Sequence, residues 1–144
     1  MYIYNLQDGL WKQSQKISPS TTRGNFGFSI SLYETTLAIG AMAEESDAGD
    51  RGSGSVYIYQ LKDNKWTESK KLTPFDSQRF GGFGSSVALS ENIMAIGSFG
   101  ESRFIGAAYI YELKDDNWKY IQKINGQKDN GMFGINQLYQ KITH

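Results

Sequence analysis

The chain has 144 residues, 15 basic and 15 acidic side chains, and no cysteine. This length corresponds to one domain or part of one, and the zero formal charge argues against a general binder of nucleic acid or anionic membranes, which needs a basic excess. Without cysteine there are no disulfides, thiolate metal sites or thiol nucleophiles, and the single histidine is the terminal residue His144. The composition therefore says little about chemistry, and the pattern of the chain says more about architecture.

The first predicted elements are two short strands joined by a tight turn. Residues 2–11 read Tyr-Ile-Tyr, a polar turn and then Trp11, and this pattern recurs at residues 57–66 and 109–118. Each turn carries the Asp, Asn or Gly residues that tolerate left-handed backbone conformations. The three tryptophans, at 11, 66 and 118, are 55 and 52 residues apart. A spacing this regular indicates a repeat architecture.

Two further strands are predicted between consecutive copies of this hairpin. Residues 26–32 alternate large apolar and small residues, which is the pattern of a strand, and residues 37–42 form the next strand. The hairpin strands that follow are residues 55–61 and 66–72. A second copy of the block begins with residues 83–89 and 94–98. No segment shows helical apolar periodicity, so the fold class is all-β with almost no helix.

A meander of four antiparallel strands over about 50 residues is typical of one blade of a β-propeller. One face of the first strand pair is bulky, and the other offers Gly27, Ser29, Ser31, Ala38 and Gly40. A bulky face against a small one lets neighbouring sheets approach closely. The alternative fold is a β-sandwich, which would not explain a repeat of about 50 residues.

The repeat predicts about three blade equivalents in a single repeat domain. Two complete blades are expected at residues 24–73 and 80–125, and one split blade from residues 1–20 with 129–144. A closed propeller ordinarily needs at least four blades. The ring is therefore expected to be incomplete, which leaves two interpretations: two chains associate head to tail as a homodimer, or this domain belongs to a longer propeller.

The residues Phe26-Gly27 followed by Gly40-Ala41, and Phe83-Gly84 followed by Gly97-Ser98, resemble the FG-GAP repeat. This resemblance implies propeller blades and a role in adhesion or protein interaction, and it suggests an extracellular or cell-surface location. The family's calcium loop between the first two strands is missing, because residues 33–36 and 90–92 hold one carboxylate each. Calcium requires six to eight oxygen ligands, so the calcium role that the resemblance implies is not expected here.

The remaining candidate sites have plain structural interpretations. The acidic loop of residues 43–52 holds four carboxylates, Glu44, Glu45, Asp47 and Asp50, which could bind calcium, but a solvated surface loop is favoured. The glycines near residues 49–54 and 81–84 precede no helix and lack the Gly-Lys-Ser/Thr of a phosphate loop. Trp11, Trp66 and Trp118 could stack on sugars, although their shared position favours packing within each blade. The Tyr-Ile-Tyr tyrosines are expected to contact neighbouring blades, with their hydroxyls at the edge.

Taken together, these patterns favour a non-catalytic protein-interaction or adhesion module. No catalytic residue, metal ligand or cofactor is assigned, and no binding residue is singled out. The alternative is a carbohydrate-binding propeller, which predicts that Trp66 and Trp118 present open ring faces. Self-association, or pairing with the remainder of a longer propeller, is expected, together with an unidentified protein or glycan ligand. Neither nucleic-acid binding nor membrane insertion is expected.

Overall fold

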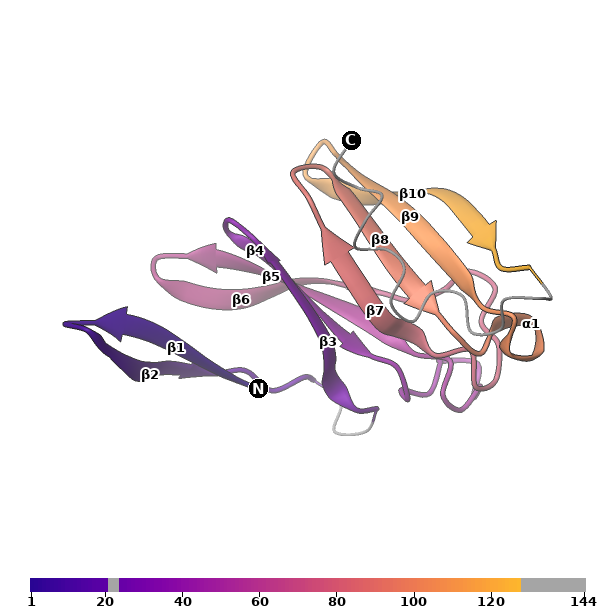
Figure 1. Cartoon of the computed structure of the whole chain (residues 1–144), viewed down its shortest axis with the longest axis horizontal. Coiled ribbons are helices and arrows are strands. Elements are labelled where there is room, and N and C mark those ends of the chain that lie inside the picture. Colours follow the sequence, from indigo (N-terminus) through magenta and orange to yellow (C-terminus); the bar gives the residue numbers. More distant parts are fainter. Residues whose placement is uncertain (21–23, 128–144) are drawn as a thin grey trace.

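The protein is all-β in the computed structural model, which describes residues 1–20 and 24–127 (Figure 1). Three antiparallel sheets contain two, four and four strands, and the described residues form no closed ring. The strands are β1 (Tyr2–Gln7), β2 (Leu10–Lys16), β3 (Phe26–Tyr33), β4 (Thr36–Ala41), β5 (Ser55–Lys62), β6 (Lys65–Leu72), β7 (Phe83–Leu89), β8 (Ile93–Ser98), β9 (Ala107–Lys114) and β10 (Asn117–Asn125).

Each four-stranded sheet is a simple meander, because every strand pairs with its neighbours in sequence. The first sheet has the order β3-β4-β5-β6 and the second β7-β8-β9-β10, whereas β1 and β2 form an N-terminal hairpin. The tight turns rest on residues that adopt left-handed conformations, such as Gly9 and the pairs Asp63-Asn64 and Asp115-Asp116. The predicted strands of the first sheet are confirmed to within one residue at each end.

The two larger sheets stack face to face, with β7 of the second sheet against β3 and β4 of the first. Small residues permit this approach: Ser29 Oγ donates a hydrogen bond to the Gly84 carbonyl oxygen over 2.8 Å, and the Leu89 N–H donates to Ser31 Oγ over 3.0 Å. A Cβ on Gly40 would lie 2.0 Å from that Gly84 oxygen. The small face predicted for the first strand pair is therefore the face on which the second sheet packs.

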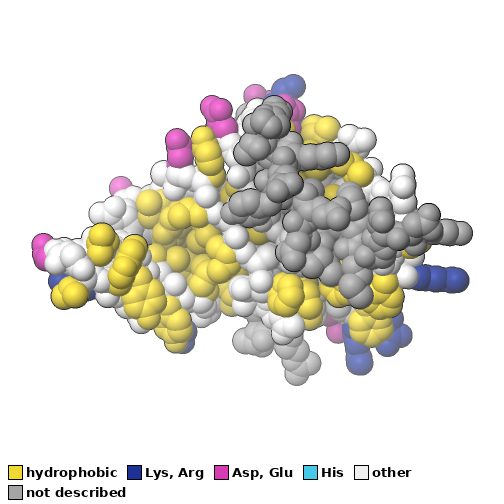
Figure 2. Space-filling model, in the orientation of Figure 1, with side chains coloured by type: hydrophobic (Ala, Val, Ile, Leu, Met, Phe, Trp, Pro, Cys, Tyr) yellow, Lys and Arg dark blue, Asp and Glu magenta, His cyan; other side chains and the backbone are white. Residues whose placement is uncertain are grey.

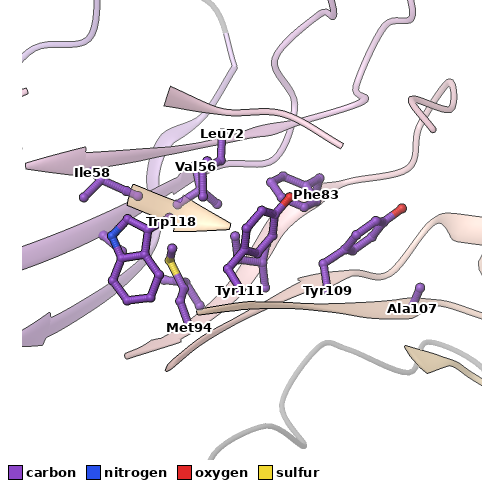
Figure 3. Packing of buried hydrophobic residues seen from close by; sticks show 12 residues of the cluster. Val56, Ile58, Leu72, Phe83, Met94, Ala107, Tyr109, Tyr111 and Trp118 are labelled. Carbon is purple, nitrogen blue, oxygen red and sulfur yellow. The ribbon is translucent and has the colours of Figure 1, made fainter. Parts of the chain in front are cut away.

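A shared hydrophobic core lies between these two sheets. Phe83, Tyr109 and Tyr111 of the second sheet meet in edge-to-face ring contacts (Figure 3), with centroids 5.1 Å apart for Phe83 and Tyr109. The first sheet contributes Val56 and Ile58, both fully buried. Burying a large apolar side chain stabilises a fold by about 1.5–3 kcal/mol, so this core holds the two sheets together as one body.

The N-terminal hairpin packs against the opposite face of the first sheet. Ile3 and Ile17 join Ile39 and Tyr57 in a second apolar cluster. The side-chain amide of Gln15 donates to the carbonyl oxygen of Trp66 over 2.7 Å, and its oxygen accepts from the Trp66 N–H over 2.9 Å. The hairpin, the indigo element in Figure 1, thus contacts β4, β5 and β6 of this face and leaves much of β3 exposed.

Three details differ from the sequence-based expectations. A register shift between Phe26 and Ser29 interrupts the alternation expected for residues 26–32, and Gly27 has a φ of 93° there. The one short helical element, α1 (Glu101–Phe104), is a tight turn in which Ser102, Arg103 and Phe104 have positive φ angles. The split blade predicted from residues 1–20 with 129–144 lies partly outside the described residues. Across the part of the chain that the structure describes, no helix is long and apolar enough to span a membrane.

Candidate functional site

The second sheet contains a buried network of opposite charges around a tyrosine. The Tyr109 hydroxyl lies 2.8 Å from Glu101 Oε1 and 2.6 Å from Asp76 Oδ1, so it donates its proton to one carboxylate or the other. Lys123 Nζ donates to Glu101 Oε2 over 2.9 Å and also forms an ion pair with Asp76. Because Glu101 is 1% exposed, water hardly reaches its carboxylate, and its compensation depends on these partners.

The first sheet repeats this arrangement around Glu44. The Tyr57 hydroxyl lies 2.8 Å and 3.0 Å from the two oxygens of Glu44, and Lys71 Nζ donates to Glu44 Oε1 over 2.8 Å. Glu44 is 4% exposed and Tyr57 is fully buried. We refer to Glu44–Tyr57–Lys71 and Glu101–Tyr109–Lys123 as the first and second Tyr–Lys–Glu networks.

Both networks are built by the same strand geometry. The tyrosine and the lysine face each other across adjacent strands, Tyr57 opposite Lys71 and Tyr109 opposite Lys123. Such directly opposed residues are close enough to interact, and each ammonium lies over its tyrosine ring, at 5.4 Å and 5.0 Å from the centroid. The carboxylate comes from the loop that leads into the tyrosine strand, three residues beyond Ala41 or Ser98, where the preceding strand ends.

The charges in these networks shift the pKa values of their members. Burial acts to lower the pKa of Lys123, but the hydrogen bonds and charges of Asp76 and Glu101 outweigh it, so the pKa rises above its ordinary value. Glu44 raises the pKa of Lys71 against burial in the same way. Burial acts to raise the pKa of Asp76, and the hydrogen bonds from Lys123 and Tyr109 bring it below its ordinary value. The pKa of Tyr109 is raised by burial and by its two carboxylate partners. Both lysines therefore stay charged and Asp76 stays ionised at neutral pH, which suits a structural network better than an acid–base pair.

The N-terminal hairpin contains the same pair of residues without a carboxylate. Tyr2 lies opposite Lys16, and Lys16 Nζ is 5.8 Å from the Tyr2 ring centroid. Among the described residues, Lys16 forms no ion pair. The hairpin thus holds two parts of a third network.

An apolar surface extends from the N-terminal hairpin onto β3, and we call it the open face. Phe28, Ile30 and Leu32 on β3 are 55%, 51% and 60% exposed. In the second sheet, Val87 occupies the position of Ile30 in the repeat and is only 7% exposed, because the first sheet covers it. Figure 2 shows hydrophobic side chains gathered over the hairpin and the adjoining part of the first sheet. The other members of the open face are Tyr2, Tyr4, Leu6 and Trp11. A patch of this kind on a folded protein marks an interaction surface.

A polar cleft of about 590 Å³ runs between the two larger sheets at their hairpin turns. Trp118, on its wall, is 5% exposed, and its indole nitrogen has no hydrogen-bond partner among the described residues. The other lining residues are Tyr33, Glu34, Thr35, Thr36, Gln60, Lys62, Ser69, Lys70, Glu91, Leu113, Asp116 and Asn117. The cleft has the size of a small-molecule site.

The residues singled out in the sequence are distributed over separate places. The acidic loop does not gather its carboxylates, because Glu44 turns into the first network while Asp50 accepts hydrogen bonds from Ser46 and Ser77. No group of three or more potential metal ligands is found in residues 1–20 and 24–127. Gly54 and Phe83 form a parallel bridge between the two sheets, and this close backbone approach accounts for the glycine at position 54.

The three tryptophans differ in exposure, although their position in the repeat is the same. Trp118 is buried, Trp66 is half-buried and Trp11 is 70% exposed. The tyrosine expectation needs a correction: Tyr57 and Tyr109 do contact neighbouring elements, but their hydroxyls are buried on carboxylates and do not lie at an edge. The sequence reasoning also missed both networks. The signal was present in the lysines that precede the last apolar residue of each hairpin, Lys16, Lys71 and Lys123.

In a comparison with protein-family models, residues 11–59 and 66–111 match a model described as FG-GAP repeat. Each matched segment covers most of the last strand of one sheet and of the first three strands of the next, β2–β5 and β6–β9. A search of curated proteins finds no match.

Proposed function

Because the chain belongs to the FG-GAP repeat family, whose repeats are general protein-interaction and adhesion-type modules, we propose that it is a non-catalytic protein-interaction module that binds through its open face. The observation that carries this proposal is the exposure of Phe28, Ile30 and Leu32 beside the aromatic residues of the N-terminal hairpin. Tryptophan and tyrosine, which this hairpin exposes, are enriched among the few residues that supply most of the binding energy in protein interfaces.

The side-chain chemistry supports a binding role over a catalytic one. The buried carboxylates Glu44 and Glu101 are each held by a lysine and a tyrosine, and the chain has no cysteine and one histidine, at its last position. A general acid or base needs a pKa near the working pH. The shifts of Lys71, Asp76 and Lys123 move away from neutrality.

A carbohydrate ligand is the second candidate, and the cleft between the sheets is the observation that favours it. Its wall combines hydrogen-bonding side chains such as Gln60 and Asn117 with the unpartnered indole nitrogen of Trp118. Trp118 offers no open ring face for stacking, since it is 5% exposed. A sugar in this cleft would therefore be held by hydrogen bonds.

The test is to measure binding of the full chain to immobilised collagen, fibronectin and laminin, with a glycan array run in parallel. Replacing Phe28 by Ser, the residue that the second sheet has at the equivalent position 85, should weaken protein binding at least about 10-fold. Phe104→Ser is the matched control, because Phe104 is 51% exposed but lies away from the open face. Equal losses in both variants, or binding to glycans alone, would overturn the proposal.

A further inference from the structure

We propose that the cleft between the two larger sheets binds a small zwitterion, whose carboxylate lies at Lys70 and Trp118 and whose ammonium lies near Glu34, Glu91 and Asp116. The chemical class is a compact molecule with one carboxylate and one ammonium, such as an amino acid or an amino sugar acid. Both walls of the cleft belong to complete four-stranded sheets. The cleft is the one considered above for a sugar, here with a charged ligand, and its occupation does not depend on the open face.

The contact between the N-terminal hairpin and the first sheet shows how the edge of an outer strand is satisfied in this protein. Gln15 of β2 reaches the outer edge of β6. Its amide donates to the Trp66 carbonyl oxygen over 2.7 Å and accepts from the Trp66 N–H over 2.9 Å. One neutral side chain therefore supplies both the donor and the acceptor that this stretch of backbone requires.

The contact between the first and second sheets has a lysine at the corresponding position. Lys70 occupies the repeat position of Gln15, and its Nζ donates to the Trp118 carbonyl oxygen over 3.3 Å. The N–H of Trp118 points away from β9, because the opposite residue, Leu113, donates its own N–H to the Asn92 carbonyl oxygen on the β8 side. An ammonium has no acceptor for that N–H. A ligand oxygen can take the place of the missing amide oxygen, accepting from the Trp118 N–H and from Lys70 together.

Two further features of this wall favour an oxyanion. Lys70 is half-buried and forms no ion pair among the described residues. Trp118 lines the cleft and packs beside Ile58 and Met94 (Figure 3), and its buried indole N–H has no hydrogen-bond partner in the part of the chain that the structure describes. Hydrogen bonds from an ammonium to a carboxylate are stronger than those between neutral groups, so this end of the cleft suits a carboxylate.

The remainder of the cleft is acidic. Glu34, Glu91 and Asp116 come from three of the turns that line its volume of about 590 Å³, and Lys62 is the other ammonium. None of these four side chains forms an ion pair within residues 1–20 and 24–127. A ligand with a carboxylate alone would add a negative charge to a cleft that already has more carboxylates than ammoniums. A zwitterion adds no net charge, and its ammonium meets the carboxylates of the turns.

The experiment is an NMR titration of the ¹⁵N-labelled full chain at low salt, which limits screening of the charges. The probes are β-alanine, γ-aminobutyrate and ε-aminocaproate, which separate their two charges by increasing lengths, and muramic acid, an amino sugar that carries a carboxylate. Whichever probe binds most tightly distinguishes an amino acid from an amino sugar acid as the source of the two charges. Butyrate and butylamine each lack one charge, and glucose and galactose lack both.

We expect saturable shifts of the Trp118 backbone and indole N–H signals, with a dissociation constant of about 0.1–10 mM for the best zwitterion. Trp118→Phe identifies the indole signal. Butyrate and butylamine should bind at least about 10-fold more weakly than that zwitterion. The neutral sugars should bind more weakly still, because they pair with neither end of the cleft.

Lys70→Gln separates binding from stability. It restores the amide that Gln15 provides at the other contact, so the new side chain can bond both the N–H and the carbonyl oxygen of Trp118 and close the site. Binding should fall at least about 10-fold, while Tm stays the same or rises. Lys70→Met removes the charge without adding an acceptor and should weaken binding to the same extent. Lys65→Gln is the matched control, since Lys65 is exposed on the same strand and does not line the cleft.

Glu91→Gln tests the acidic end of the cleft. It should weaken binding of the zwitterion about 2- to 5-fold, the range of an exposed ion pair, without weakening binding of butyrate. Asp63→Asn is the control, because Asp63 is an exposed turn residue outside the cleft.

The result that overturns the proposal is clear in each arm. No saturable shift with any zwitterion below about 50 mM, equal affinity for butyrate or butylamine, or unchanged binding in Lys70→Gln would each remove it. Equal or tighter binding of glucose or galactose would remove it in favour of a neutral sugar. The proposed function is decided separately by Phe28→Ser and the matrix proteins, because Phe28 does not line the cleft. Either proposal can therefore fail while the other stands.

Discussion

Removing Lys123 should destabilise the protein more than removing either of its two counterparts in the repeat. Lys123→Met keeps much of the aliphatic stem but leaves Glu101, which is 1% exposed, without its ammonium partner. Breaking a buried ion pair costs about 3–5 kcal/mol. Tyr109 still donates a hydrogen bond, and Asp76 is exposed enough to be rehydrated. We therefore expect a loss near the lower limit, about 3 kcal/mol.

The other two lysines give a graded series within the same chain. The Lys71 side chain is 29% exposed, against 14% for Lys123, and it forms an ion pair with Glu44. Because the pair is more exposed to water, Lys71→Met should cost about 2 kcal/mol. Lys16 has no ion pair among the described residues, and Lys16→Met should change the free energy of unfolding by less than about 0.5 kcal/mol.

Urea unfolding followed by tryptophan fluorescence measures these differences, with the slope m checked for each variant. Glu101→Gln combined with Lys123→Met should recover part of the loss, because the uncompensated charge is then removed as well. Equal costs for all three lysines, or a cost below about 0.5 kcal/mol at Lys123, would refute the argument that burial of the carboxylate sets the magnitude.

Two further predictions concern the sheet contact and pH. Gly54→Ala should cost at least about 3 kcal/mol in urea unfolding, because its Cβ would lie 2.1 Å from the Phe83 carbonyl oxygen at a φ of 90°. Gly9→Ala is the control: its φ is 77° but the space around it is open, so it should cost only about 1 kcal/mol. Similar costs for the two variants would contradict the clash at Gly54. Asp76 has a lowered pKa in the folded state, so its contribution is complete above its ordinary value of 3.8 and is lost as the pH falls through the lower folded value. Lys71 and Lys123 have raised pKa values, so theirs is complete below 10.5 and is lost as the pH rises through the folded values. Stability should thus be flat at neutral pH and fall at both extremes, and Asp76→Asn should reduce the acid fall in a series of thermal unfolding curves.

The repeat predicted the strands well because strand patterning and turn chemistry are local. The alternation of residues 26–32 and the Asp-Asn turn at residues 63–64 locate the strands whatever packs against them. The networks could not be predicted in this way. Their carboxylates come from loops of unequal length, so Glu44 and Glu101 are separated by 57 residues while Tyr57 and Tyr109 are separated by 52. Matching the hairpin blocks alone does not align the two acids.

The exposure of residues at equivalent repeat positions could not be predicted from the sequence either, because it depends on which sheet packs against each residue. Trp118 faces a four-stranded sheet and is buried, Trp66 faces the two-stranded hairpin and is half-buried, and Trp11 has no neighbouring sheet among the described residues and is 70% exposed. Identical positions in a repeat therefore have unequal surroundings near its margins. For the same reason, Ile30 belongs to the open face while Val87 belongs to the core.

The origin of the carboxylates determines where this chain can be divided for circular permutation or exchange of repeats. A break between β4 and β5, or between β8 and β9, would separate the loop that carries Glu44 or Glu101 from the strands that neutralise it. A break between Leu72, which ends β6, and Asp76 separates no ion pair of the described residues, since Asp76 stays with Tyr109 and Lys123 of the second sheet. The transferable unit is then Asp76 together with β7–β10, a segment whose charge pairs are all internal to it.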